Sequence, residues 1–173
     1  MDGQLPLPLP SDDTLAVARE RVMAERWEKG STCPCCDQMA KVYARTLYAG
    51  LAVDLIKAWR YVRDGDPFQW FHMPTAISHR AGDAAKAAHW GLIEPMPDVR
   101  REDGGKAGWW RFTPVGIGWV KGTSSVPRYA LIYNKVLQRV DGPPWSIRDA
   151  LGKEFDLREL LEPTPRPTEG DGS

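Results

Sequence analysis

The spacing of apolar residues predicts two helices in the first part of the chain. Ser11 or Asp12 can cap a helix that runs to about Lys29 and is ended by Gly30. Its apolar stripe consists of Leu15, Ala18, Val22 and Trp27. A second stripe recurs every four residues and predicts a long central helix over residues 38–63. Its members are Tyr43, Leu47, Leu51, Leu55 and Trp59.

Shorter apolar runs and helix breakers follow the central helix. The aromatic run 68–73 predicts a strand, and Pro74 then opens a short helix that Gly82 breaks. Residues 83–90 predict a second short helix closed by Gly91. Two strands, 92–96 and 109–113, are joined by a charged, glycine-rich loop.

The C-terminal part predicts a hairpin between helices. A helix begins at Pro114, and the strands 128–133 and 136–140 flank Asn134 and Lys135 as a second hairpin. Residues 146–161 are helical with a break near Gly152. The expected organisation is an extended tail 1–11, a helix and cysteine turn 12–37, a core 38–122, a hairpin and helix 123–161, and a disordered tail 162–173.

The order of elements in the core is that of a winged helix-turn-helix. The sequence AAKAAHWGLIEP followed by GWWRFTPVGIGWV also resembles MarR-type and PadR-type regulators, in which a recognition helix runs into a basic wing. We therefore expect an α+β fold: a winged helix-turn-helix core with an N-terminal helix, a cysteine turn and a C-terminal β-hairpin plus helix. The whole chain, with its TCPCC opening and SIRDALG ending, resembles small uncharacterised phage and prophage proteins.

The resemblance implies double-stranded DNA as the partner. Helix 83–90 would enter the major groove and loop 98–107 would be the wing. The candidate DNA-binding residues are His79, Arg80, Lys86, His89, Arg100, Arg101, Lys106 and Arg111. The helix departs from the family because alanines at 84, 85, 87 and 88 leave few groups to recognise bases, and Glu102 and Asp103 dilute the charge of the wing.

Charge keeps a second function class open. The chain carries 23 basic and 23 acidic residues, and a neutral balance is unusual for strong non-specific nucleic-acid binding. The positive charge is concentrated in segment 38–122, which carries 12 basic and 8 acidic residues. The alternative is a winged-helix adapter that binds a host or phage protein. Exposed aromatic residues could also stack on single-stranded bases, with Trp109 and Trp110 as candidates, although tryptophans in a small domain mostly form core.

Three clustered cysteines suggest a metal site. Cys33 and Cys36 have the C-x2-C spacing with which two thiolates bind structural Zn²⁺ from a tight turn. Candidates for the remaining ligands are His72, Cys35, His79, Asp37 or the cysteine pair of a second subunit. Cys33 and Cys35 also form a C-x-C pair that would suit copper(I). Free thiols in a turn are the plain alternative.

Other features point to a non-enzymatic protein of the cytoplasm. The sequence contains no G-x-S-x-G, phosphate-binding glycine loop or H-E-x-x-H motif, and the C-terminal carboxylates Asp149, Glu154 and Asp156 fit a solvated helix face. No secretory signal or membrane-spanning run is expected. Leu15, Val22 and the predicted C-terminal hairpin add apolar surface, which suggests a homodimer.

Overall fold

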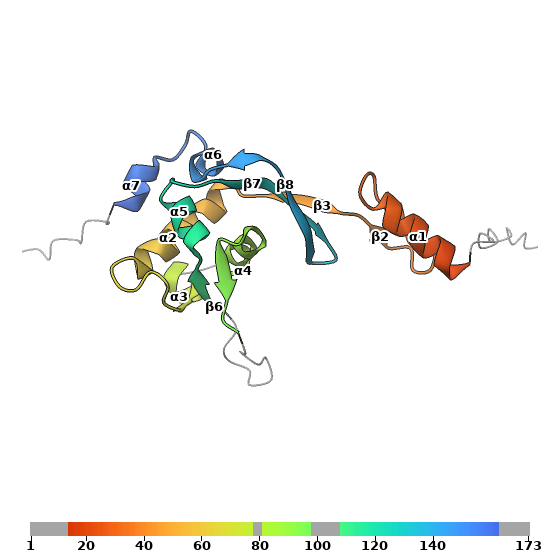
Figure 1. Cartoon of the computed structure of the whole chain (residues 1–173), viewed down its shortest axis with the longest axis horizontal. Helices are drawn as coiled ribbons and strands as arrows, with labels where there is room; N and C mark the ends of the chain where they lie inside the picture. The colour runs from red at the N-terminus through yellow and green to blue at the C-terminus, as the bar shows by residue number, and fades with distance from the viewer. Residues whose placement is uncertain (1–13, 78–80, 98–107, 163–173) are drawn as a thin grey trace, which may run out of the picture. The chain divides into compact units, whose positions relative to one another are not determined.

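The computed structural model describes residues 14–77, 81–97 and 108–162. It confirms the α+β class, because helices alternate with several small antiparallel sheets. The chain forms two compact units (Figure 1): unit 1 comprises residues 1–45 and 131–139, and unit 2 comprises residues 46–130 and 140–173. The tail expected at 1–11, the tail expected at 162–173 except for Glu162, and the wing expected at 98–107 lie outside the described residues.

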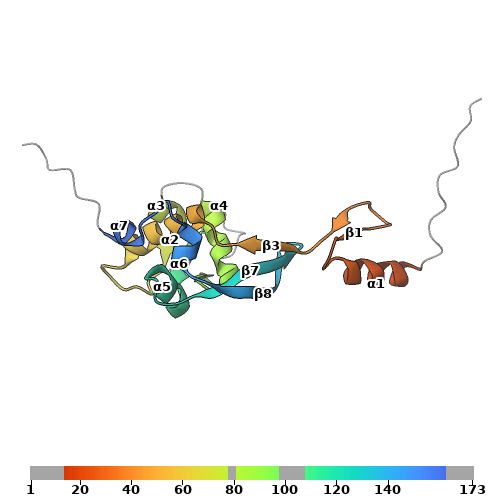
Figure 2. The ribbon, with the colours of Figure 1, turned by 90° about the horizontal axis from the view of Figure 1, so that it is seen from above.

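Unit 1 begins with a helix shorter than the one expected. Helix α1 spans Leu15–Glu25, and the Thr14 hydroxyl caps it by accepting a hydrogen bond from the Val17 N–H at 3.4 Å. Ala18 and Val22 are buried, whereas Trp27 lies beyond the end of the helix. Strands β1 (Ser31–Thr32) and β2 (Met39–Ala40) then pair antiparallel beside α1 (Figure 2), so the cysteines occupy the turn of a small hairpin.

The long central helix expected over 38–63 is wrong over residues 38–48. Residues Tyr43–Thr46 form strand β3, and helix α2 spans only Ala49–Val62. Strand β3 pairs with β7 (Val126–Tyr133), in a three-stranded sheet of order β3-β7-β8 whose last strand is β8 (Val136–Trp145). Tyr43 and Leu47 fit a helical spacing, but the strand's partner lies far along the chain, so pairing overrides the local pattern.

The core of unit 2 forms around α2, which packs against α3 (Met73–Ile77), α5 (Pro114–Val120), α6 (Ile147–Leu151) and α7 (Leu157–Leu161) (Figure 2). Leu55 and Ile56 are fully buried on this helix, and Trp59 meets Phe112 edge-on with ring centroids 5.7 Å apart. The elements after α2 are β4 (Phe71–His72), α3 (Met73–Ile77), α4 (Ala81–Ala84), the 3₁₀ helix η1 (Ala85–Trp90), β5 (Ile93–Pro95) and β6 (Trp109–Phe112).

Strands β4, β5 and β6 form an antiparallel sheet in the order β4-β6-β5, with Phe71 opposite Trp110 and Ile93 opposite Phe112. The prediction of an α-helix over 83–90 is wrong in part, because residues 83 and 84 end the α-helix α4 and residues 85–90 form a 3₁₀ helix. Trp90 is buried and its indole N–H donates to the Pro127 carbonyl at 2.8 Å. We attribute the tighter winding to this anchor, which overrides the helix propensity of the alanines.

The C-terminal predictions are confirmed in outline. Helix α5 (Pro114–Val120) begins at the expected proline, and strands β7 (Val126–Tyr133) and β8 (Val136–Trp145) are joined by Asn134 and Lys135. Both turn residues have positive φ, 48° and 64°, as a two-residue hairpin requires. Strand β8 is longer than expected because prolines are tolerated on an edge strand.

The final helical stretch is broken where the sequence indicates. Helix α6 (Ile147–Leu151) ends at Gly152, whose φ is 69°, and α7 (Leu157–Leu161) follows. A side chain at this backbone conformation would be strained, so glycine ends the helix here. Among the helices of the described ranges, none has the length and apolar character needed to cross a bilayer.

Gly116 provides a test of how unit 2 packs. A Cβ at this position would collide with the backbone carbonyl of Leu92, so Gly116→Ala must push α5 away from the start of β5. We expect a loss of about 2–3 kcal/mol in unfolding free energy, the range for overpacking a core. Gly118→Ala on the same helix meets the Ser124 hydroxyl, a side-chain group that can rotate away, and should change stability by less than about 1 kcal/mol. Urea unfolding of both variants measures the contrast, and equal effects would contradict this packing.

Candidate functional site

The segment expected to recognise DNA presents a narrow outward face. Ala84, Ala87 and Trp90 are buried against the core, and Lys86 is exposed. His89 is half-buried beside Trp90, with ring centroids 6.5 Å apart. The structure thus places two of the predicted DNA-binding residues, Lys86 and His89, together on η1.

Lys86 is held by a neighbouring carboxylate. Its ammonium lies 2.5 Å from Asp83 Oδ1, and the Tyr48 hydroxyl donates to Asp83 Oδ2 at 3.2 Å. Burial and the Asp83 carboxylate raise the pKa of Tyr48, so this hydroxyl keeps its proton at neutral pH. Lys86 would have to exchange this ion pair for a phosphate in order to add affinity for DNA.

His89 is uncharged at neutral pH. Burial, and then the nearby Lys86 ammonium, lower the pKa of His89 below its ordinary value of 6.5. A neutral imidazole has one donor and one acceptor nitrogen, so it can hydrogen-bond to a base edge but does not neutralise a phosphate.

Arg111 contacts its own sheet. It stands opposite Glu94 in the β5-β6 ladder and forms an ion pair with the Glu94 carboxylate. Its guanidinium also lies over the Trp70 ring, 4.6 Å from the centroid. These contacts couple Arg111 to β5 and to the segment before β4. The other predicted DNA-binding residues, His79, Arg80, Arg100, Arg101 and Lys106, lie outside the described residues.

The cysteine turn is a tight, hydrogen-bonded loop. The Cys33 N–H donates to the Gln38 carbonyl at 2.9 Å, and the Asp37 N–H donates to the Cys33 carbonyl at 2.9 Å. The Cys33 thiol is half-buried and accepts hydrogen bonds from the Cys35 backbone and from Cys36, which lower its pKa. Burial, followed by the charge of Cys33, raises the pKa of Cys35. The turn therefore favours a thiolate at Cys33.

The described residues do not complete a metal site. Across ranges 14–77, 81–97 and 108–162, no group of three or more His, Cys, Asp or Glu side chains is arranged to hold a metal ion. His72 belongs to unit 2, where its Nδ1 lies 3.0 Å from the Thr75 hydroxyl and its ring lies against Trp109. Asp37 follows the cysteines directly in the turn, and His79 lies outside the described residues.

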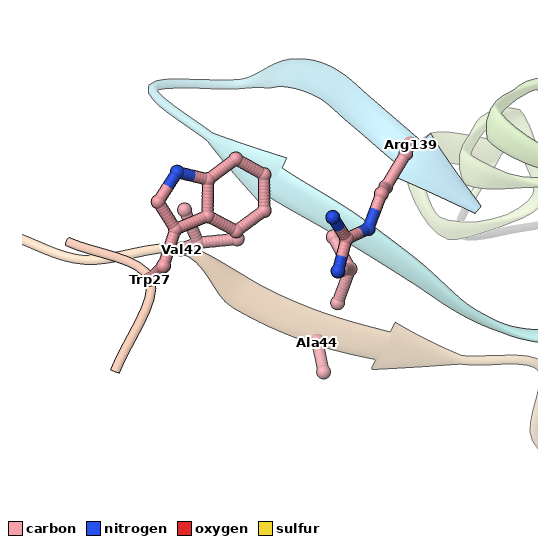
Figure 3. Close-up of a pocket in the computed structure, with 5 residues that line it drawn as sticks. Trp27, Val42, Ala44 and Arg139 are labelled. Carbon is pink, nitrogen blue, oxygen red and sulfur yellow. The ribbon is translucent and has the colours of Figure 1, made fainter. Parts of the chain in front are cut away.

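Unit 1 contains a further candidate site that the sequence does not predict. Trp27 and Arg139 line a hollow with Val42, Ala44 and Leu131, which we call the Trp27 hollow (Figure 3). The Arg139 guanidinium lies 5.0 Å from the centroid of the Trp27 ring. The helical spacing places Trp27 in the stripe of the first helix, and the absence of acidic residues from 104 to 140 is the sequence signal for this surface.

Comparison with known protein families, with curated proteins and with solved structures found no match to this chain. Function is therefore inferred from the residues and from their geometry.

The role of Arg111 can be tested by a double-mutant cycle with Glu94. Because the pair also involves the Trp70 ring, we expect Arg111→Met to cost about 1–2 kcal/mol of stability and the coupling to Glu94→Gln to be about 0.5–1 kcal/mol. Arg158 and Glu162 form a matched but more exposed pair on α7, for which the coupling should be near zero. Thermal unfolding of the variants gives both coupling energies. A coupling energy of zero for Arg111 and Glu94 would mean that this ion pair does not hold Arg111 in place, which would make Arg111 available to a ligand.

Proposed function

We propose that this chain is a DNA-binding winged-helix protein, a phage or prophage regulator without enzymatic activity. The observation that carries the proposal is the sheet order β4-β6-β5, with α3 and the α4–η1 segment between β4 and β5. A winged helix has this arrangement, in which the second helical segment faces the major groove and the loop between the last two strands forms the wing. The phage or prophage assignment rests on the sequence resemblance.

Binding would depend mainly on phosphate contacts. Lys86 and His89 lie on the outward side of η1, while the alanines around them offer no hydrogen-bonding groups to bases. His79, Arg80 and the wing cations Arg100, Arg101 and Lys106 would add charge on either side. Such an interface gives salt-dependent affinity with modest sequence discrimination. Arg111 would act indirectly, by holding β6 to β5.

A homodimer would double this interface. Leu15 and Val136 are exposed by 72% and 61%, and both belong to unit 1. Large apolar side chains left in water favour association, and a symmetric dimer would allow binding to two half-sites of an operator.

A second candidate function is an adapter that binds a host or phage protein through the same fold. It is favoured by the ion pairs of Lys86 with Asp83 and of Arg111 with Glu94. Paired cations contribute less to phosphate binding, because the carboxylate repels the phosphate that would replace it.

We also propose that Cys33 and Cys36 hold a structural Zn²⁺. The β1-β2 hairpin presents both thiols from one turn, and backbone N–H groups directed at the Cys33 sulfur favour the thiolate that zinc requires. Cys35 or the cysteine pair of a second copy would complete the coordination. The ion would tie the turn together without any catalytic step.

The DNA proposal is tested by a salt titration of binding to mixed-sequence duplex DNA. We expect steep salt dependence, and Lys86→Glu should weaken binding and reduce the slope of log K against log salt by about 1. Lys57→Glu is a matched control, because Lys57 on α2 has similar exposure and also faces an aspartate three residues earlier.

The double charge reversal Arg100→Glu with Arg101→Glu should reduce the slope further. If the protein does not bind duplex DNA at low salt, the DNA proposal is wrong and the adapter becomes the better candidate. Equal losses in Lys86→Glu and Lys57→Glu would mean that net charge alone drives binding.

Zinc is tested by elemental analysis of protein purified without added metal. We expect about one zinc per chain, or about half if two copies share four thiolates, and near-complete loss in Cys33→Ser and Cys36→Ser. Cys35→Ser separates the arrangements, because it should retain zinc only where a second copy supplies the other ligands. Zinc-free wild-type protein, or copper in its place, would contradict the proposal.

A further inference from the structure

The Trp27 hollow has the dimensions and lining of a ligand pocket. Its volume is about 430 Å³, within the range of roughly 300–1,000 Å³ that ligand pockets occupy. Buried Val42 lines it together with Ala44 and Leu131, and Trp27 remains 40% exposed. Figure 3 shows the Arg139 side chain extending from β8 toward β3. The hollow therefore combines an accessible aromatic ring, aliphatic side chains and a cation.

The strand segments that line the hollow contain cations and no acidic residues, whereas Glu25 and Glu28 lie close to Trp27 in the sequence. Residues 38–53 contain no aspartate or glutamate, and the next run without acidic residues, 104–140, includes β7, the turn and the start of β8. The cations that these runs contribute to unit 1 are Lys41, Arg45, Lys135 and Arg139. A surface with this charge fits an anionic partner.

Arginines in unit 1 lie over aromatic rings. Arg26 lies between two rings, with its guanidinium carbon 4.7 Å from the Tyr133 centroid and 5.6 Å from that of Trp27. Arg45 lies 5.9 Å from the ring of Tyr43, which is 50% exposed. Contact with a ring orients a guanidinium without neutralising its charge, so these arginines still attract phosphate.

From this combination we propose that the Trp27 hollow binds single-stranded nucleic acid. One base stacks on the Trp27 indole above Val42, and Arg139 and neighbouring cations hold the phosphates. Bases in a duplex already stack on one another and cannot enter such a hollow, whereas every unpaired base offers a face to a tryptophan. The cations and Tyr43 beyond the hollow suit a strand better than a single nucleotide.

This site is separate from the duplex-binding surface proposed above. Lys86 and His89 belong to unit 2, whereas every residue lining the Trp27 hollow belongs to unit 1. The inference does not depend on the winged-helix proposal, and either can fail without the other.

The test is fluorescence anisotropy of labelled oligo-dT and oligo-U of about 12 nucleotides, a length within the usual site sizes of single-strand binders. Trp27→Leu should weaken binding about 5- to 150-fold, which corresponds to the loss of one base stack. Trp27→Phe keeps an aromatic face and should restore most of the affinity. Phe155→Leu is the matched control, because Phe155 has a similar exposure of 41% and lies in unit 2.

Charge is tested in the same assay. Arg139→Gln should reduce the slope of log K against log salt by about 0.7, the value for one phosphate of a single strand. Arg158→Gln on the exposed side of α7, which belongs to neither proposed surface, should leave the slope unchanged. The two oligonucleotides distinguish DNA from RNA as the source of the strand.

Several results would overturn the proposal. These are no binding of either oligonucleotide at low salt, undiminished binding by Trp27→Leu, and competition by a mononucleotide as strong as that by the oligonucleotide. Sedimentation showing a dimer that dissociates in Trp27→Leu and Arg139→Gln would instead assign this face to a second copy of the chain. Circular dichroism of each variant confirms that the fold is intact.

Discussion

The pairing of β3 with β7 is the constraint on which both the course of the chain and the candidate surface of unit 1 depend. A strand that pairs with a distant partner cannot also be part of a helix, so α2 begins only at Ala49. The same pairing joins segments far apart in sequence, and Ala44 and Leu131 thereby line one hollow. The helix propensity of residues 43–46 is weaker than the stabilisation that these residues gain from hydrogen bonds to β7.

The two candidate surfaces use cations in different ways. On η1, Lys86 is paired with Asp83, so its charge is largely balanced within the protein. In unit 1, Arg26 and Arg139 lie over aromatic rings, and the surrounding strands contain few carboxylates. A neutral chain can still carry a locally positive surface where two segments without acidic residues, 38–53 and 104–140, pair as β3 and β7.

Several elements could be predicted because their causes are local. Asn134 and Lys135 adopt positive φ in a two-residue turn, Gly152 ends α6, and Pro114 begins α5 behind the Thr113 cap. Each depends on the conformations open to one or two residues. The tight turn around Cys33 and Cys36 was likewise visible from spacing, whereas the hydrogen bonds to the Cys33 sulfur required the folded hairpin.

The sequence by itself determined the α+β class, the order of most helices and strands, the turns at glycine and proline, and the candidate cations and thiols. Only the tertiary structure decided that residues 43–46 are a strand, that η1 is tightly wound, that Arg111 is held by Glu94, and that Trp27 faces Arg139. Turn and cap preferences arise within a few residues, so sequence reveals them. Strand partners and side-chain neighbours depend on contacts between distant segments, and these exist only once the chain has folded.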